Sequence, residues 1–320
     1  MKVVIPGGTG QVGTALRRAL RRDGHEVVIL TRRAAGPGQA AWDGERLGPW
    51  AAEVDGSDVV INLAGRSVNC RYTKSNLTQM MRSRVRSTRV IGAAIAAAER
   101  PPLVWLQMST AAIYAHGTSA PNDEADGVIG GDEAGVPGYW AFSVHIARAW
   151  ERELADAVTP MTRKVALRTT MVMTPDRGGV FDVLSRLARL GLGGAVAGGG
   201  QYVSWIHEDD FIAAVRFIIE RNSMTGPVNL AAPGPVRQRD LMRELRAAWG
   251  VPVGLPATRW MAELGARALR SDSELLLKSR WVVPAALSEA GFEFRFPAWP
   301  AAAGDLVRQS RRRALGSEGD

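Results

Sequence analysis

KVVIPGGTGQVG, residues 2–13, places a short apolar run directly before three glycines that recur at every third position. The run at 2–6 predicts a buried strand, because a continuous apolar segment ended by glycine suits the interior of a parallel sheet. Apolar residues at helical spacing follow over 11–23, and a second apolar run, EVVIL, occupies 26–30. A strand, a helix and a strand within about 30 residues form the smallest unit that joins parallel strands. The chain therefore begins with a predicted βαβ unit.

The same alternation continues along the chain. Strand-like runs lie at 58–63, 103–108 and 165–168, with helical runs at 77–99 and 140–157 between them. Such alternation predicts an α/β fold, a Rossmann-type doubly wound parallel sheet with helices on both faces. After Thr170 the sequence becomes rich in glycine, and further elements are expected, with helices at 180–190, 209–221, 238–249 and 259–269 and a strand at 228–230.

These patterns predict how the chain divides into domains. Residues 1–170 form the Rossmann domain, to which elements of about 203–232 return. Residues 171–202 and 233–307 form a smaller C-terminal substrate lobe, and residues 308–320 a flexible tail.

The glycines fit the pattern G-x-x-G-x-x-G between a strand and a helix. Gly7 allows the tight turn, Gly10 lets a pyrophosphate approach the backbone, and Gly13 allows the helix to pack closely on the strand. The N-terminus of the helix presents free N–H groups and a positive partial charge to phosphates. The loop therefore predicts a dinucleotide site formed by Gly7, Thr9, Gly10, Gln11, Val12 and Gly13.

The end of the second strand indicates which dinucleotide binds. An acidic residue there would bind the ribose 2′-hydroxyl of NAD, but the sequence has Thr31, Arg32 and Arg33. Because arginine can bind a 2′-phosphate through two parallel hydrogen bonds and stack on adenine, we expect NADP(H). If one of the two arginines only lies on the surface and does not contact the cofactor, Arg33 is that residue rather than Arg32.

Composition excludes several other classes of protein. The net charge is +8, but the arginines are scattered along the chain. Their excess is typical of a GC-rich coding sequence, so no nucleic-acid partner is expected. No run of about 20 apolar residues exists, which argues against a membrane partner. Cys70 is the only cysteine and the four histidines are dispersed, so we expect no disulfide, no metal site and a cytoplasmic location.

Further segments resemble one known family. They are NLAG at 62–65, RYT at 71–73 followed by SRV at 83–85, LGLGG at 190–194, QY at 201–202, SWIHEDD at 204–210, GPVNL at 226–230 and ELLLKSRWVVPAALSEAGFEFRFP at 274–297. Together they resemble the atypical extended short-chain dehydrogenases/reductases of the sugar-nucleotide epimerase-like (NAD-dependent epimerase/dehydratase) subgroup, with a small C-terminal domain of unknown function.

This resemblance implies bound NADP(H) and a small-molecule substrate between the Rossmann domain and the C-terminal lobe. It places Thr31 and Arg32 at the 2′-phosphate. By the same resemblance, further cofactor contacts fall at Leu63, Ala64, Gly65, Arg84, Ser109 and Thr170. A homodimer would also be in keeping with it.

The Tyr-x-x-x-Lys pair of ordinary short-chain dehydrogenases is missing. None of the four tyrosines has a lysine four residues later, and alignment on Glu151 puts Ser143 and Ala147 at the two positions. Lysine-assisted tyrosine catalysis is therefore excluded. Reduction is not, because the nicotinamide supplies the hydride and only a proton donor or oxyanion stabiliser is then needed.

Three hydroxyl groups are candidate catalytic groups: those of Thr110, Tyr114 and Tyr139. We expect an NADPH-dependent reductase, an oxidoreductase acting on a small carbonyl, enone or imine. Two alternatives stay open, a redox-neutral epimerase or isomerase that keeps NADP bound and a non-catalytic NADP-binding sensor.

Overall fold

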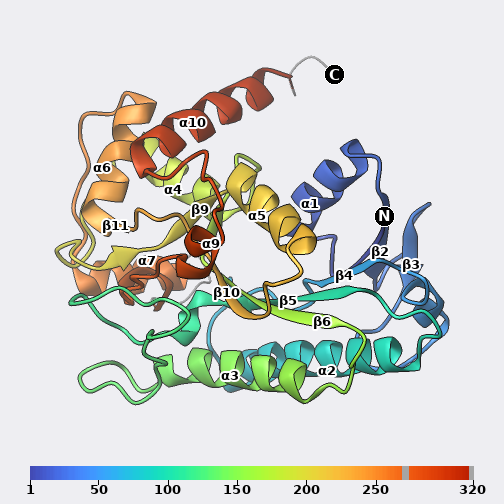
Figure 1. Ribbon diagram of the computed structural model, residues 1–320. Helices are drawn as coiled ribbons and strands as arrows, with labels where there is room; N and C mark the ends of the chain where they lie inside the picture. The colour runs from blue at the N-terminus through green and yellow to red at the C-terminus, as the bar shows by residue number, and fades with distance from the viewer. Residues whose placement is uncertain (269–273, 317–320) are drawn as a thin grey trace.

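Seven parallel strands form one sheet in the computed structural model, which describes residues 1–268 and 274–316 (Figure 1). Their order is β10-β6-β5-β4-β1-β2-β3, so β1 lies in the middle, with β2 on one side and β4 on the other. The strands span Lys2–Pro6 (β1), Glu26–Thr31 (β2), Gln39–Ala41 (β3), Val59–Asn62 (β4), Val104–Thr110 (β5), Arg163–Thr169 (β6) and Gly226–Leu230 (β10). The chain changes direction between β1 and β4, the point at which sheets of this type bind ligands.

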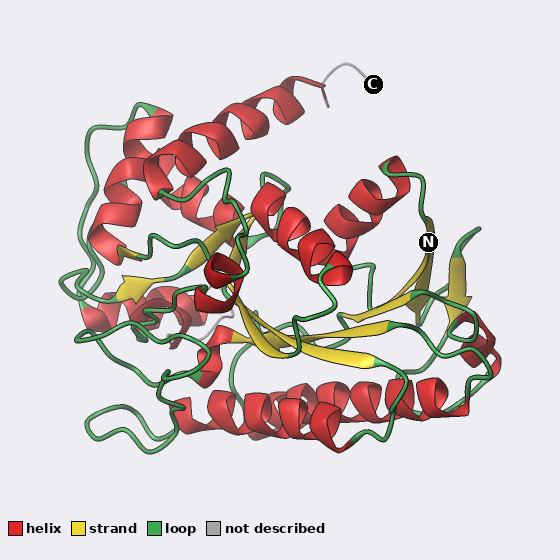
Figure 2. Cartoon of the chain, in the orientation of Figure 1, coloured by secondary structure: helices red, strands yellow, loops and turns green. Residues whose placement is uncertain are grey.

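Helices cover both faces of the sheet (Figure 2). On one face lie α1 (Gln11–Arg22) and α5 (Glu208–Glu220), and on the other α2 (Lys74–Ala97) and α3 (Trp140–Asp156). Successive strand residues point to opposite faces. Ile5 therefore joins the core beneath α1 and α5, whereas its neighbour Val4 joins the core beneath α2 and α3. This arrangement confirms the predicted Rossmann-type doubly wound fold.

A third core lies in the C-terminal lobe. Trp205 and Trp299 meet there edge to face, with ring centroids 5.0 Å apart, between α4, α6 and α10. The short strands β7 and β9 pair in parallel, and β8 and β11 pair antiparallel. The remaining elements are η1 (Pro49–Glu53), η2 (Ala111–Ile113), β7 (Met171–Met173), α4 (Val180–Arg189), β8 (Tyr202–Val203), β9 (Trp205–His207), β11 (Val236–Arg237), α6 (Gln238–Trp249), α7 (Arg259–Ala268), α8 (Glu274–Leu277), α9 (Ala285–Glu289) and α10 (Trp299–Gly316).

The predicted flexible tail at 308–320 is wrong over 308–316, because α10 continues to Gly316. Leu306 and Val307 are buried in the lobe, the Ser310 hydroxyl donates to the Pro175 carbonyl, and Arg313 pairs with Asp176. These contacts reach a segment more than a hundred residues away, so the arginine-rich sequence carried no sign of them. Residues 317–320 and Leu269, the predicted end of a helix, lie outside the described residues.

The outer surfaces of α2 and α3 are charged. Arg89 of α2 donates two hydrogen bonds to Glu153 of α3, at 2.8 and 2.9 Å, and both Arg82 and Arg86 pair with Glu45. Among the described helices, none combines the length and the apolar character needed to cross a membrane.

Candidate functional site

The glycine loop between β1 and α1 touches the end of β4. Gly7 has φ +74°, and a Cβ atom there would lie 2.6 Å from the Ala64 Cα atom. A Cβ on Gly13 would lie 2.5 Å from the Gly8 Cα atom, so Gly13 lets the helix pack on the loop itself rather than on the strand. Both glycines are therefore required by contacts within the protein.

Gly10 differs from these two glycines. It is the N-cap of α1 at φ −73° and ψ 174°, which any residue can adopt, and a Cβ there would meet only the Gly7 carbonyl oxygen, at 4.0 Å. Among the described residues no side chain caps the helix, and its first turn holds no acidic residue. The structure thus leaves space at Gly10 and the N–H groups of the first turn of α1 uncapped by any described side chain, which fits the close approach of a pyrophosphate.

The other loop residues have separate roles. Thr9 is exposed, and Val12 packs against the core beneath α1. The Gln11 side-chain amide donates to the Thr174 hydroxyl, so it ties α1 to the segment after β7. Gln11 and Val12 can therefore offer a ligand their backbone N–H groups rather than their side chains.

Two cations at the end of β2 have no acidic partner among the residues that the structure describes. Thr31 is buried, and its hydroxyl accepts the N–H of Arg33 at 3.4 Å. Arg32 and Arg33 are both exposed, and neither makes an ion pair with any described residue. Because β1 and β2 are parallel neighbours, these arginines lie at the same edge of the sheet as the glycine loop.

Arg84 lies against the end of β4, close to the same loop. A Cβ on Gly65 would be 3.3 Å from the Arg84 guanidinium carbon, which also lies 4.9 Å from the centre of the Trp150 ring. Burial lowers the pKa of Arg84 to about 10. Leu63 and Ala64 complete this edge, since the Leu63 N–H donates to the Pro6 carbonyl. The glycine loop, the end of β4 and Arg84 thus lie close together.

A buried polar network joins α3 to the end of the sheet, and it involves two predicted site residues. Glu151 accepts hydrogen bonds from Arg168 at 2.8 and 3.0 Å and from the Ser109 hydroxyl at 2.6 Å. Arg168 also donates to the Tyr114 hydroxyl, which donates in turn to Asn229, both at 2.9 Å. Burial alone would lower the pKa of Arg168, but the hydrogen bonds and the charge attraction from Glu151 and Tyr114 together outweigh burial and raise the pKa.

The network engages the hydroxyl groups of Ser109 and Tyr114, for which the sequence predicts a cofactor contact and a catalytic role. Tyr114 is 1% exposed, and burial raises the pKa of its phenol. Its hydroxyl is fully engaged with Arg168 and Asn229. The sequence could not show this, because both partners lie more than 50 residues away.

Thr110, Thr170 and Tyr139 lie in different surroundings. The Thr110 oxygen accepts the N–H of Ala112, which leaves the hydroxyl proton for another acceptor. The Thr170 hydroxyl donates to the Leu230 carbonyl at 2.8 Å. Tyr139 is 42% exposed at the N-terminus of α3. Of these three hydroxyl groups, that of Thr110 lies half-buried at a strand end with its proton available to another acceptor.

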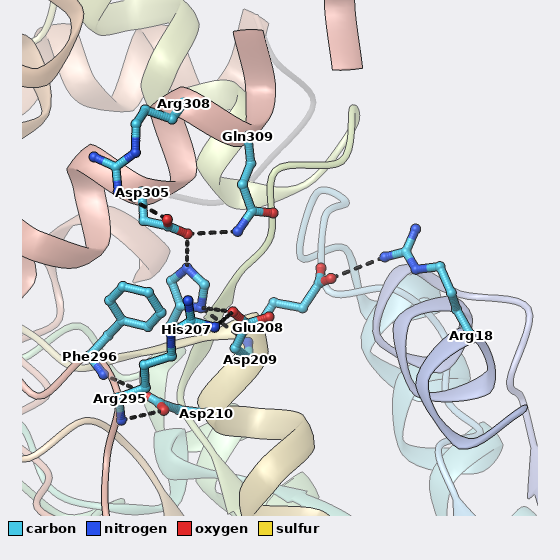
Figure 3. Close-up of polar contacts among 10 residues, drawn as sticks. All are labelled: Arg18, His207, Glu208, Asp209, Asp210, Arg295, Phe296, Asp305, Arg308 and Gln309. Atoms are coloured by element: carbon cyan, nitrogen blue, oxygen red, sulfur yellow. Dashed lines mark hydrogen bonds and ion pairs between the residues drawn. The ribbon is translucent and has the colours of Figure 1, made fainter. Parts of the chain in front are cut away.

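A second polar cluster surrounds His207, which is fully buried between β9 and α5 (Figure 3). Its Nδ1 accepts the N–H of Asp209, its Nε2 lies 3.4 Å from Asp305, and its ring stacks on Phe296 at 4.0 Å. Burial lowers the pKa of His207, whereas Asp209 and Asp305 raise it.

Within the described part of the chain, His207, Asp209 and Asp305 are the one group whose spacing could suit a metal ion. Because Nδ1 accepts the N–H of Asp209, His207 can offer a metal ion only Nε2, which faces Asp305. Its contacts show that it anchors α10 to the sheet domain.

Sequence reasoning used the segment at 274–297 only for the resemblance and did not place Glu274 or Lys278 in the site. The Ser143 hydroxyl donates to Glu274 at 2.6 Å, and Lys278 donates to the Ala112 carbonyl at 3.2 Å. The only sequence signal was the i, i+4 spacing of the two charged residues in ELLLK. The structure therefore brings the side-chain carboxylate of Glu274 to Ser143, the position at which the catalytic tyrosine is absent.

The sheet, the glycine loop before α1 and the C-terminal lobe together define a protein of the extended short-chain dehydrogenase/reductase class. The model of the NAD dependent epimerase/dehydratase family matches residues 3–231, and that of DUF1731, a domain of unknown function, matches residues 258–306. The chain belongs to the NAD dependent epimerase/dehydratase family, which confirms the resemblance found in the sequence.

Several known proteins are similar over nearly the whole chain. Epimerase family protein SDR39U1 of Mus musculus is 32% identical over 320 residues, covering 96% of this chain and all of that protein. The crystal structure of human epimerase family protein SDR39U1 with NADPH is 28% identical, with a TM-score of 0.84, and covers 96% of this chain and 99% of that one. A nucleoside-diphosphate sugar epimerase from Corynebacterium glutamicum is 26% identical with a TM-score of 0.74, covering all of this chain and 68% of that one.

Proposed function

We propose that the protein binds NADP(H) and uses it to reduce a small carbonyl, enone or imine compound. The observation that carries the proposal is the open start of α1 at Gly10, which lies at the same sheet edge as the unpaired Arg32 and Arg33. Free N–H groups suit a pyrophosphate, and the arginines suit a 2′-phosphate. The NADPH in the structure of the human relative supports the same dinucleotide.

Arg32 is expected to decide the preference for NADPH over NADH. In the Arg32→Ala variant, NADPH affinity should fall roughly 10- to 100-fold, because a charge-assisted hydrogen bond contributes about 1.5–3 kcal/mol. NADH affinity should change little, since NADH lacks the 2′-phosphate. Fluorescence titration measures both, and Arg33→Ala is the matched control with a smaller effect. Tighter binding of NADH than of NADPH by the wild type would contradict the proposal.

The chemistry follows from the hydroxyl groups at the end of β5. When bound, NADPH supplies a hydride. Thr110 keeps its hydroxyl proton for a substrate oxygen, because its own oxygen already accepts from Ala112. A hydrogen bond at that place stabilises the negative charge that develops on the oxygen of a carbonyl during reduction. Tyr139 is a second candidate donor, whereas the Tyr114 hydroxyl is engaged in the buried network.

The test is consumption of NADPH by the purified protein across a panel of small carbonyls, enones and imines. At least one compound should be reduced, and Thr110→Ala should lower kcat roughly 100-fold, the usual cost of losing one oxyanion donor. Absence of NADPH consumption across the panel would contradict a reductase.

The same experiment separates the two alternatives. Substrate conversion without net loss of NADPH would indicate a redox-neutral epimerase or isomerase. Tight NADPH binding with no turnover at all would indicate a sensor. The missing tyrosine–lysine pair weighs against the epimerase, because sugar-nucleotide epimerases use that pair.

A further inference from the structure

A buried carboxylate from the C-terminal lobe lies against α3. Glu274, the first residue of α8, is fully buried, and the Ser143 hydroxyl donates to its Oε2 atom at 2.6 Å. Ser143 is the position that the sequence assigns to the absent tyrosine. A serine oxygen lies much closer to its helix than a tyrosine oxygen does, so a carboxylate bound to it occupies space that a tyrosine ring would fill.

Lys278 stands four residues after Glu274, the same spacing as in the missing pair. Only 1% of its side chain is exposed, and its ammonium lies 3.8 Å from the Glu274 Oε1 atom. It also donates to the Ala112 carbonyl, and the N–H of Ala112 donates to Thr110. Lys278 is therefore bonded to the turn that positions the Thr110 hydroxyl.

Other charged groups face this pair. Arg280 lies 3.5 Å from the Glu274 Oε1 atom. Glu133 accepts the N–H of His116, and the His116 Nδ1 atom accepts the N–H of Ser279. Burial lowers the pKa of Lys278, Arg280 lowers it further, and Glu274 and Glu133 oppose this shift. Burial also lowers the pKa of His116.

The energetic cost of this arrangement argues for a function. Burying a carboxylate with two cations costs several kcal/mol of desolvation, and apolar residues would often fill such a volume with equal or better stability. Buried ionisable groups gathered beside a ligand site are typical of catalytic machinery. Here they meet Ser143, which is half-buried, and the turn of the half-buried Thr110.

We propose that Glu274 and Lys278 take the place of the missing pair and pass a proton to the substrate through the Ser143 hydroxyl. This inference rests on the proposed NADPH-dependent reduction. The substrate carbon gains the hydride, and its oxygen takes the Ser143 hydroxyl proton. The serine oxygen is reprotonated by the Lys278 ammonium through Glu274: the carboxylate takes a proton from Lys278 and passes a proton to the serine oxygen, and water then reprotonates the neutral Lys278 amine. Ser143 touches the substrate, and Glu274 and Lys278 act through it.

Three variants test the relay, with NADPH and phenanthrenequinone as the probe substrate. Ser143→Ala and Glu274→Gln should each lower kcat roughly 100-fold and flatten the pH profile, as the loss of general acid catalysis does. Ser143→Thr, which keeps the hydroxyl, should retain most of kcat. NADPH affinity, measured separately by fluorescence, should be unchanged in all three. Ser143→Ala leaves the buried ion pairs intact, so this variant tests the relay even if Glu274→Gln folds poorly.

Glu208→Gln is the matched control, because Glu208 is a buried glutamate paired with an arginine, Arg18, at 3.0 Å. It should keep the wild-type kcat and pH profile. A second readout needs no cofactor: trace acetylation of the apoprotein over a range of pH, with the exposed Lys74 as the internal reference. Lys278 should become reactive at lower pH than Lys74, and at still lower pH in Glu274→Gln.

The outcomes separate this inference from the proposed function. If the wild type oxidises no NADPH with any acceptor, the proposed reduction fails and the relay fails with it. If the wild type is active but Ser143→Ala and Glu274→Gln keep its kcat and pH profile, only the relay is wrong. If Tyr139→Phe loses activity while Ser143→Ala behaves as the wild type, Tyr139 is the proton donor, and this result would also overturn the relay.

Discussion

Replacement of Gly10 by aspartate is expected to abolish NADPH binding while leaving the fold at least as stable. A side chain at Gly10 has room, because its Cβ would meet only the Gly7 carbonyl oxygen, at 4.0 Å. Aspartate at an N-cap accepts the free N–H groups of the helix, which should stabilise the protein by a few tenths of a kcal/mol. The same carboxylate accepts the N–H groups that are assigned to the pyrophosphate, and its negative charge repels that of the pyrophosphate.

Affinity for NADPH should therefore fall at least about 100-fold, since placing like charges together costs several kcal/mol. Fluorescence titration gives the affinity, and urea unfolding of the apoprotein gives the stability. Gly10→Asn is the matched control: it caps the helix without the charge and should lose less affinity. Unchanged NADPH binding by Gly10→Asp would remove the start of α1 from the cofactor site.

The second large effect is expected at Arg168, at the centre of the buried network. Arg168→Met leaves Glu151 buried without its cation and Tyr114 without one partner. Side-chain exposures of 10% for Arg168 and 17% for Glu151 mean that solvent screens the pair little. The free energy of unfolding should fall by roughly 3–5 kcal/mol, the usual cost of breaking a buried ion pair.

The measurement is urea unfolding, followed by the change in midpoint at constant slope. Arg89→Met is a close control, because Arg89 also binds a glutamate of α3 through two hydrogen bonds but is 67% exposed. Its cost should stay below about 1 kcal/mol. Equal losses in the two variants would show that the buried network contributes no more than a surface ion pair.

The order of strands and helices could be predicted because it depends on neighbouring residues. Apolar runs such as 2–6 and 26–30 and the helical spacing over 11–23 are visible without any knowledge of the partners. β3, by contrast, was missed, since it has three residues that are half-buried or exposed and no apolar run. The glycine spacing and the arginines after β2 were equally local, and the structure brings them to one edge of the sheet.

Whether a hydroxyl is free was decided only in three dimensions. The Tyr114 hydroxyl meets Arg168, which is 54 residues away, and the Ser143 hydroxyl meets Glu274, which is 131 residues away. By itself the sequence determined the alternation of strands and helices and the glycine loop, and it predicted NADP(H) from the arginines after β2. Tertiary structure decided which side chains are already engaged, because hydrogen bonds and burial join segments whose separation along the chain no local pattern records.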